Sequence, residues 1–321
     1  MQDTLLSVHD LKVYYTGRGS LVRAVNGVSF EVKEGEVVAL VGESGSGKTT
    51  AALSILQLLP PAAKIVSGKI IYRGMNLLTM SNDDLTKIRG KEIAMIFQDP
   101  TTYLNPLMKV GEQIAEVIIL HENVGREKAK EKAVEILKSV KIPDPERIYD
   151  QYPHQLSGGM AQRVGIAIAI ACKPSFLIAD EPTSALDLTI QSQILHLLRN
   201  LNREMGLAIL LITHDLGIVA GIANKVIVMY AGQVMEEADV YSVFEEPKHP
   251  YSQALLSASR YASGDVVKIA ESKPLNLPNL SSKGCKFYAR CPHGLERCGE
   301  KDPPEVFLQD NRRVKCWLYG K

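Results

Sequence analysis

A short glycine-rich stretch of this chain has the composition of a loop that wraps around phosphate groups. Residues 42–49 read GESGSGKT, which fits the phosphate-loop pattern of a glycine, four residues of any type and then Gly-Lys-Thr. The apolar run 36–41 precedes the stretch and the helix-like run 51–59 follows it, as the pattern requires. Backbone N–H groups can then point at the phosphates, helped by the dipole of the following helix. The predicted nucleotide-binding residues are Gly42, Ser44, Gly45, Ser46, Gly47, Lys48, Thr49 and Thr50.

Two of these residues have distinct chemical tasks. Lys48 would supply a point charge to the β- and γ-phosphates, and Thr49 would ligate Mg²⁺ through its hydroxyl group. The alternative is a glycine-rich turn between a strand and a helix that binds no ligand. The complete match and its setting favour the nucleotide site.

Polar side chains that could do chemistry follow two further apolar runs. Asp180 and Glu181 end the run 177–179, and His214 lies at the end of the run 207–213. In phosphoryl transfer, Asp180 would hold the water shell of the metal ion while Glu181 orients and polarises the attacking water. His214 would contact the γ-phosphate. The alternatives are a solvated acidic pair and a structural histidine, and the apolar runs favour the catalytic interpretation.

The sequence LSGGM at residues 156–160 resembles the signature of the ATP-binding-cassette (ABC) family. The resemblance covers Leu5 to about Leu256 and departs from the common pattern at Ala161, where the family has a basic residue or glutamine. It implies an ATPase that binds ATP and Mg²⁺, with Thr49, Gln98 and Asp180 at the metal ion. The resemblance also implies that Tyr15 stacks on adenine and that Gln98 senses the metal ion and the water. It implies that Asp187 bridges the two subunits. The residues implied to contact ATP on the opposite subunit are Ser157, Gly158, Gly159 and Gln162.

The resemblance also implies that two such subunits act together. In the family, the signature serine and the glycine N–H groups reach the γ-phosphate that the opposite subunit binds. We therefore expect a monomer to be a poor ATPase. ATP would hold the two subunits together, and hydrolysis would remove that contact.

Two further segments, 97–114 and 245–258, resemble ATPase subunits of importers of di- and oligopeptides. The implied partners are a second ABC ATPase subunit in a heterodimer, two transmembrane permease subunits and an extracytoplasmic substrate-binding protein. The chain would lie peripherally at the cytoplasmic face of the cell membrane. Tyr103, Leu104 and Pro106 would line a groove for a short helix of the membrane subunit, with an ordinary surface loop as the alternative. Nickel and oligosaccharides are the alternative cargoes.

Composition and charge weigh against other classes of function. A net charge of +1 with interspersed acids and bases gives no electrostatic footprint for nucleic acid. The longest apolar run, 164–172, is too short to span a bilayer, and the first ten residues lack a signal-peptide pattern. We therefore expect a soluble cytoplasmic chain. One alternative is a soluble ABC ATPase that acts on ribosomes or DNA, but such proteins generally have two cassettes or a long coiled-coil insertion, and neither is seen in this sequence. The other is a regulatory cassette, which should lack Lys48, Glu181 or His214, whereas this chain has all three.

The alternation of strand-like and helix-like runs predicts an α/β fold. We expect an ABC-type core, with a mixed sheet around the phosphate loop and an antiparallel flank at 5–15 and 24–35. The ATPase domain would span 1–260, with a helical subdomain at about 99–172. Residues 261–321 would form a linker, centred on 272–284, and a small Cys-rich module. Strands are predicted within 36–42, 93–97, 175–180, 207–213 and 225–230, and one buried helix face at Ala133, Ile136, Leu137 and Val140.

Four of the five cysteines crowd into the last forty residues, whereas Cys172 lies in an apolar run that predicts a core helix. Disulfides are disfavoured in a reducing cytoplasm. The spacings of five, six and seventeen intervening residues lack the pair separated by two that is typical of zinc sites. Four thiolates at loose spacing suit a 4Fe–4S cluster. The pattern resembles the C-terminal tails of peptide-importer ATPases, which implies the same cluster. Zinc is the alternative metal, and His293 could replace one cysteine as a ligand. We expect the cluster to be structural rather than redox-sensing. The predicted ligands are Cys285, Cys291, Cys298 and Cys316.

Overall fold

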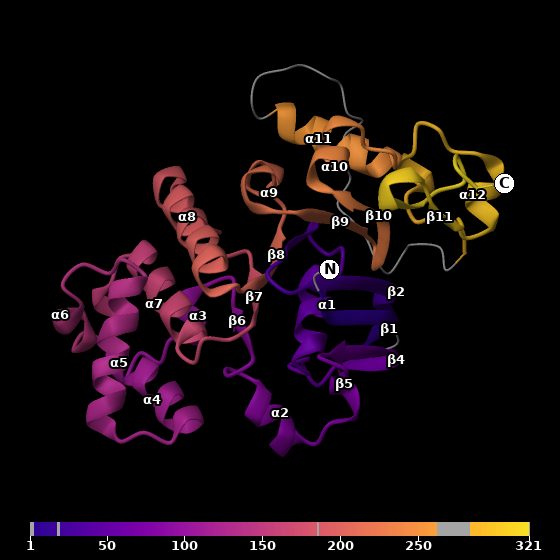
Figure 1. Cartoon of the computed structure of the whole chain (residues 1–321). Coiled ribbons are helices and arrows are strands. Elements are labelled where there is room, and N and C mark those ends of the chain that lie inside the picture. The colour runs from indigo at the N-terminus through magenta and orange to yellow at the C-terminus, as the bar shows by residue number, and fades with distance from the viewer. Residues whose placement is uncertain (1–2, 18–19, 185, 262–282, 321) are drawn as a thin grey trace. The chain divides into compact units, whose positions relative to one another are not determined.

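The computed structural model describes residues 3–17, 20–184, 186–261 and 283–320. The chain divides into two compact units (Figure 1). The first unit comprises Met1–Leu78 and Ile212–Lys321, and the second comprises Thr79–Leu211. Most of the predicted linker at 272–284 lies outside the described residues.

An antiparallel sheet opens the first unit. The long strands β1 (Thr4–Gly17) and β2 (Ser20–Lys33) pair along nearly their whole length, which confirms the predicted antiparallel flank. Two further strands complete the order β2-β1-β4-β5. They are β4 (Ala63–Tyr72) and β5 (Met75–Asn76).

The remaining strands of the first unit form a mixed arrangement. Strand β3 (Val37–Val41) is buried at all five positions and pairs in parallel with β9 (Lys225–Tyr230). Strand β9 is antiparallel to β10 (Gln233–Asp239), so parallel and antiparallel pairing meet at β9. This confirms the mixed α/β core. The helices of this unit are α1 (Lys48–Ile55), α9 (Leu216–Ile222), α10 (Val240–Glu245) and α11 (Pro250–Tyr261).

The second unit is mostly helical, and Figure 1 shows α3 to α7 grouped together. Ala133, Leu137 and Val140 of the predicted helix face are buried, whereas Ile136 is only partly covered. Its strands β6 (Ile93–Ile96) and β7 (Phe176–Asp180) pair in parallel, and β8 (Ala208–Thr213) leads back to the first unit. The helices are α2 (Asn82–Ile88), α3 (Pro100–Tyr103), α4 (Val110–Glu122), α5 (Arg126–Ser139), α6 (Pro145–Tyr149), α7 (Gly158–Ile170) and α8 (Leu188–Met205), and the short 3-10 turns of this region are η1 (Leu77–Thr79) and η2 (Pro153–Gln155).

Residues 283–320, called here the tail segment, are not set apart as a compact unit of their own. Their strand β12 (Arg313–Lys315) pairs with β10 of the first unit, and Val314 at its centre is fully buried. Arg313 bonds Ser29 and Glu237 of that unit. Packing against a neighbouring strand thus replaces the separate module expected from the sequence. The elements of the tail segment are η4 (Tyr288–Arg290), α12 (Glu296–Glu300), β11 (Glu305–Phe307), η5 (Gln309–Asn311) and β12 (Arg313–Lys315).

Cys172 differs from its predicted place in a core helix. It follows Ala171, the residue that caps α7, and is half-buried. Its thiol lies 3.7 Å from the carbonyl oxygen of Val117, and burial raises its pKa to about 11. The thiol is therefore protonated at neutral pH.

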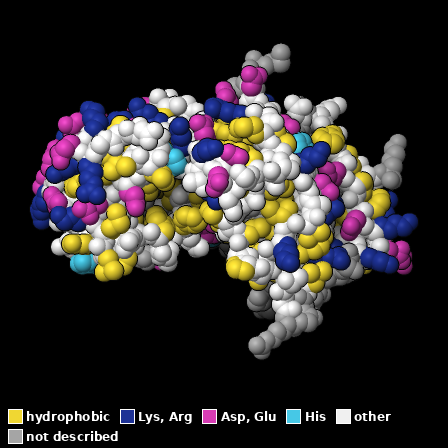
Figure 2. All heavy atoms as spheres, turned by 90° about the horizontal axis from the view of Figure 1, so that it is seen from below, with side chains coloured by type: hydrophobic (Ala, Val, Ile, Leu, Met, Phe, Trp, Pro, Cys, Tyr) yellow, Lys and Arg dark blue, Asp and Glu magenta, His cyan; other side chains and the backbone are white. Residues whose placement is uncertain are grey.

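Basic and acidic side chains are mixed on the surface of the protein. On the face that Figure 2 shows, Lys and Arg side chains are interspersed with Asp and Glu, as 37 basic and 36 acidic residues lead one to expect. Among the helices of the described residues, none combines the length and apolar character needed to cross a bilayer.

Candidate functional site

The phosphate loop lies between the end of β3 and the start of α1, as predicted. Gly42 and Gly47 both have positive φ, at 151° and 101°. A Cβ atom at Gly42 would overlap the carbonyl oxygen of Met229, and one at Gly47 would overlap that of Ala24. Only glycine fits such close backbone contacts. The loop is therefore wound tightly against its neighbours in the first unit.

The side chain of Lys48 turns back into this loop. Its Nζ donates to the carbonyl oxygens of Gly42, at 2.7 Å, and Glu43, at 3.0 Å. A third contact, at 3.3 Å, goes to the hydroxyl of Ser46. Only 5 % of Lys48 is exposed. A buried ammonium inside a loop of backbone amides provides the positive potential that a polyphosphate requires.

Tyr15 lies beside the start of α1. Its hydroxyl is hydrogen-bonded to that of Thr50, with 3.3 Å between the two oxygens. The ring is half-buried near the end of β1. The structure thus brings Tyr15, predicted to stack on adenine, to the first turn of the helix that the phosphate loop opens.

The acidic pair and Gln98 come together within the second unit. Asp180 ends β7 and is buried, whereas Glu181 follows in a left-handed conformation, with φ of 44°. The amide nitrogen of Gln98 donates to a carboxylate oxygen of Glu181 at 2.9 Å. Strained backbone of this kind is concentrated at functional sites, where it aims a side chain. The arrangement presents a carboxylate and an amide that could hold one water molecule between them.

Ser184 is a site residue that the sequence analysis missed. Its hydroxyl lies 3.0 Å from the carbonyl oxygens of both Gln98 and Glu181. It therefore links the two segments that carry the predicted water-positioning groups. The only signal in the sequence was its place three residues after Glu181.

His214 lies in the first unit, directly after β8, and is exposed. The next residue, Asp215, donates its N–H to the Thr213 hydroxyl at 3.0 Å. The Asp215 carboxylate accepts from the N–H of Gly217 at 2.8 Å and so caps α9. These two bonds fix the backbone on the carboxyl side of His214.

The signature residues form the N-terminus of α7. Ser157 is the cap residue, and its hydroxyl accepts from the N–H of Met160 at 3.4 Å. Ser157 and Gly158 are exposed, so the start of the helix is accessible, as an anion-binding helix end requires. Asp187 is likewise exposed and caps α8 through the N–H of Ile190. Gln162, in contrast, is only 2 % exposed, so it does not share this surface.

The segment predicted to meet a membrane subunit is held in shape by one glutamine. Gln113 accepts from the N–H of Asn105 and donates to the carbonyl oxygens of Asn105 and Met108, each at 3.0 Å. Leu104 is buried, so the prediction that it lines a surface groove is wrong. Leu107 is 86 % exposed and takes that outward place beside Pro106.

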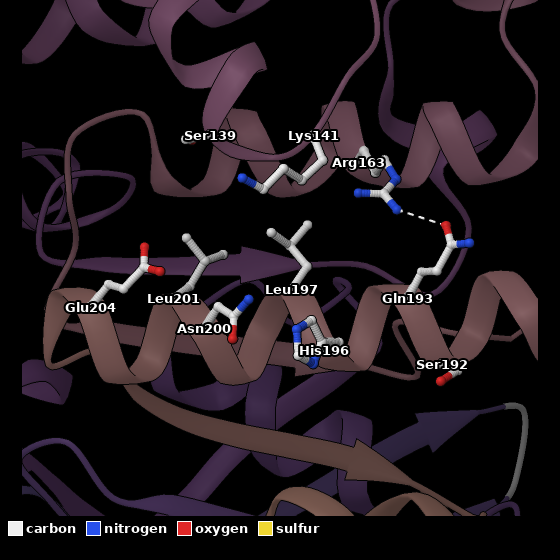
Figure 3. A pocket seen from close by; sticks show the side chains of 10 residues that line it. All are labelled: Ser139, Lys141, Arg163, Ser192, Gln193, His196, Leu197, Asn200, Leu201 and Glu204. Atoms are coloured by element: carbon white, nitrogen blue, oxygen red, sulfur yellow. Dashed lines mark hydrogen bonds between the residues drawn. The ribbon is translucent and has the colours of Figure 1, made fainter.

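A pocket of about 530 Å³ lies elsewhere in the second unit, lined by residues of α8, by Arg163 of α7 and by Ser139 and Lys141 at the end of α5 (Figure 3). Arg163 donates to Gln193 at 2.9 Å and to the carbonyl oxygen of Val140 at 2.8 Å. The two guanidinium contacts thus link α7 to α8 and to the end of α5. None of the residues that line this pocket is a predicted nucleotide-binding residue, so we assign it no part in the nucleotide site.

The four cysteines of the tail segment are neighbours. The N–H of Cys285 donates to the carbonyl oxygen of Cys298 at 2.7 Å. Burial, with smaller contributions from the other three thiols, raises the pKa of Cys285 to about 11. Among the residues that the structure describes, however, no three His, Cys, Asp or Glu side chains form a group that could hold a metal ion. The geometry therefore supports neither the predicted iron–sulfur cluster nor the zinc alternative.

Two family models match this chain. The model described as "ABC transporter" matches residues 25–184, which include the phosphate loop, the signature and the acidic pair. The model described as "Oligopeptide/dipeptide transporter, C-terminal region" matches residues 235–298, which include α10, α11 and three of the tail cysteines.

Relatives cover nearly the whole chain. A probable peptide ABC transporter ATP-binding protein of Sinorhizobium fredii is 49% identical over 98% of this chain and 95% of its own. An oligopeptide transport ATP-binding protein of Bacillus subtilis is 47% identical over 98% and 97%. A solved dimeric ATP-binding cassette in a post-hydrolysis state, bound to ADP and phosphate, is 31% identical, with a TM-score of 0.67 over 73% of this chain and 98% of that one. The chain therefore belongs to the ATP-binding proteins of the ABC transporter family.

Proposed function

We propose that this chain is the ATP-hydrolysing subunit of an importer of di- or oligopeptides. The observation that carries hydrolysis, rather than nucleotide binding alone, is the hydrogen bond between Gln98 and Glu181 beside the buried Asp180. The peptide cargo is supported by the match at 235–298 and by the relatives named as peptide transport proteins. Nickel and oligosaccharides are the competing cargoes.

The residues predicted to bind ATP and to position the attacking water then have separate tasks. Lys48 and the loop N–H groups bind the β- and γ-phosphates, Tyr15 stacks on adenine, and His214 contacts the γ-phosphate. Glu181 orients the attacking water and accepts its proton while Gln98 holds that water in place. A magnesium ion, held by Thr49 and Asp180 with Gln98 near it, would neutralise charge on the phosphates.

We propose a dimer as the active form, with a second ABC ATPase as partner. The exposed N-terminus of α7, with Ser157 and Gly158, and the exposed Asp187 provide the surface for that partner. The similar solved cassette is dimeric, which supports a dimer as the active form. Two permease subunits would anchor the pair at the cytoplasmic face of the membrane, and a substrate-binding protein would deliver peptide.

The cargo can be tested on the assembled transporter. In proteoliposomes that contain this chain, its partner ATPase, the permeases and the binding protein, we expect ATP-dependent uptake of radiolabelled di- or oligopeptides. Unlabelled peptide should compete, and nickel or an oligosaccharide should not. ATP-dependent uptake of nickel without peptide uptake would contradict the proposed cargo, and ATP hydrolysis without uptake would contradict the transport role.

The 4Fe–4S cluster stays a prediction that metal analysis can decide. It rests on the clustering of four cysteines in the last forty residues of the sequence. Burial raises the pKa values of the Cys285, Cys291 and Cys316 thiols, so cluster binding would have to displace protons. After anaerobic purification we expect about four irons and four sulfides per chain, the content of such a cluster. Cys291→Ser should lose them, and the matched control Cys172→Ser should keep them. A protein purified without metal, or with zinc, would refute the prediction.

A further inference from the structure

Glu43 places a negatively charged side chain in a loop that binds a polyanion, and the structure shows how this charge is balanced. It is the second residue of the phosphate loop. Its carboxylate accepts two parallel hydrogen bonds from Arg290, both at 2.9 Å. An unpaired carboxylate at this position would repel the phosphates. Arg290 of the tail segment therefore supplies the charge that balances an acid of the nucleotide loop.

The backbone of Glu43 is held as firmly as its side chain. Its N–H donates to the hydroxyl of Tyr251 in α11 at 2.9 Å. Its carbonyl oxygen accepts from the ammonium of Lys48 at 3.0 Å. Hydrogen bonds to its N–H, its carbonyl oxygen and its carboxylate thus set the orientation of this residue, with the carbonyl turned to Lys48 and the side chain bound to the tail segment.

The Arg290–Glu43 pair is sheltered rather than loose on the surface. The two side chains are 26 % and 29 % exposed. Bidentate arginine–carboxylate pairs are stronger and more directional than single contacts between exposed charges. This pair can therefore fix the position of Glu43 in the phosphate loop.

Arg290 is itself positioned by aromatic packing. The neighbouring Phe287 is 2 % exposed and contacts the rings of Tyr230 and Tyr251, with centroid distances of 5.4 and 5.3 Å. The Arg290 guanidinium lies 5.7 Å from the ring centroids of Tyr230 and Phe287, and it donates to the Tyr230 hydroxyl at 3.3 Å. The tail segment is therefore anchored by Phe287 where its arginine reaches the loop.

We propose that Arg290 and Tyr251 are positioning residues for ATP binding, with the tail segment completing the phosphate loop. Arg290 neutralises Glu43 and holds its carboxylate in a fixed direction, while Tyr251 fixes the N–H of the same residue. The loop then keeps the shape that binds phosphates before ATP arrives. This inference rests on the proposed function, because it concerns ATP affinity at that same site.

Steady-state ATPase of the assembled transporter tests the inference. Arg290→Gln should raise the KM for ATP roughly tenfold, which corresponds to about 1.4 kcal/mol, and change kcat less than twofold. Arg290→Lys keeps the charge without the fork and should give an intermediate KM. The matched control is Arg297→Gln, because Arg297 also directly precedes a cysteine but its side chain donates to the carbonyl oxygen of Trp317 and stacks on the Trp317 ring. Its KM should match that of the wild type.

The double variant separates charge neutralisation from simple loss of packing. Because Glu43→Gln removes the carboxylate that Arg290 balances, Glu43→Gln with Arg290→Gln should bring the KM back to within about threefold of wild type. A double variant no better than Arg290→Gln would overturn the inference, as would an Arg290→Gln enzyme with the KM of the Arg297→Gln control. A wild-type transporter that fails to hydrolyse ATP would instead overturn the proposed function.

Discussion

Replacement of Glu181 by glutamine is expected to reduce the ATPase rate of the assembled transporter by roughly a hundredfold to a thousandfold, the scale of a lost general base. The carboxylate follows the buried Asp180, and the left-handed backbone at φ 44° holds it beside the amide of Gln98. An amide of the same shape cannot accept the proton of the attacking water. ATP affinity should be retained, because the phosphate-binding loop is unchanged. The phosphate released per minute and the Kd for ATP are the two measurements.

The matched control for this substitution is Glu204→Gln. Glu204 is an exposed glutamate near the end of α8, in the same unit as Glu181. We expect this control substitution to leave the ATPase rate unchanged. A Glu181→Gln transporter that retains more than a few per cent of the wild-type rate would refute the role of general base. The ATP-bound dimer should also persist longer in this variant, since hydrolysis no longer removes the γ-phosphate that holds it together.

The core strands and the loop glycines were predictable because local sequence dictates them. A run such as Val37–Val41 is buried at every position and has few options besides a central strand. Gly42 and Gly47 have the positive φ angles that the loop requires, so the motif alone indicates them, although their close backbone contacts are to the distant Met229 and Ala24. The helix face around Leu137 follows from its period, and the structure confirms most of it.

Other features depend on contacts between distant segments, which no local pattern encodes. Arg290 bonds Glu43, which lies 247 residues away in the sequence. The sequence around Arg290 predicted only metal ligands, namely the nearby cysteines. Leu104 and Leu107 are equally apolar, but in the segment that Gln113 holds by hydrogen bonds Leu104 is buried and Leu107 is exposed. The tail segment joins the first unit through the three-residue strand β12, which is too short to be recognised from sequence.

Lys48→Ala is expected to weaken ATP binding by roughly a hundredfold or more. Two charge-assisted contacts to phosphates contribute about 1.5–3 kcal/mol each, and 1.4 kcal/mol corresponds to a tenfold change in Kd. The Lys48 ammonium also bonds the carbonyl oxygens of Gly42 and Glu43, so its removal additionally loosens the loop. Lys48→Arg should not restore affinity, because a planar guanidinium does not fit the place of a buried point charge. Calorimetric titration of the Mg²⁺-supplemented protein with ATP gives the Kd, and Lys33→Ala, which removes an exposed lysine at the end of β2, is the control. A Lys48→Ala protein that binds ATP as tightly as Lys33→Ala would show that the loop does not hold the phosphates.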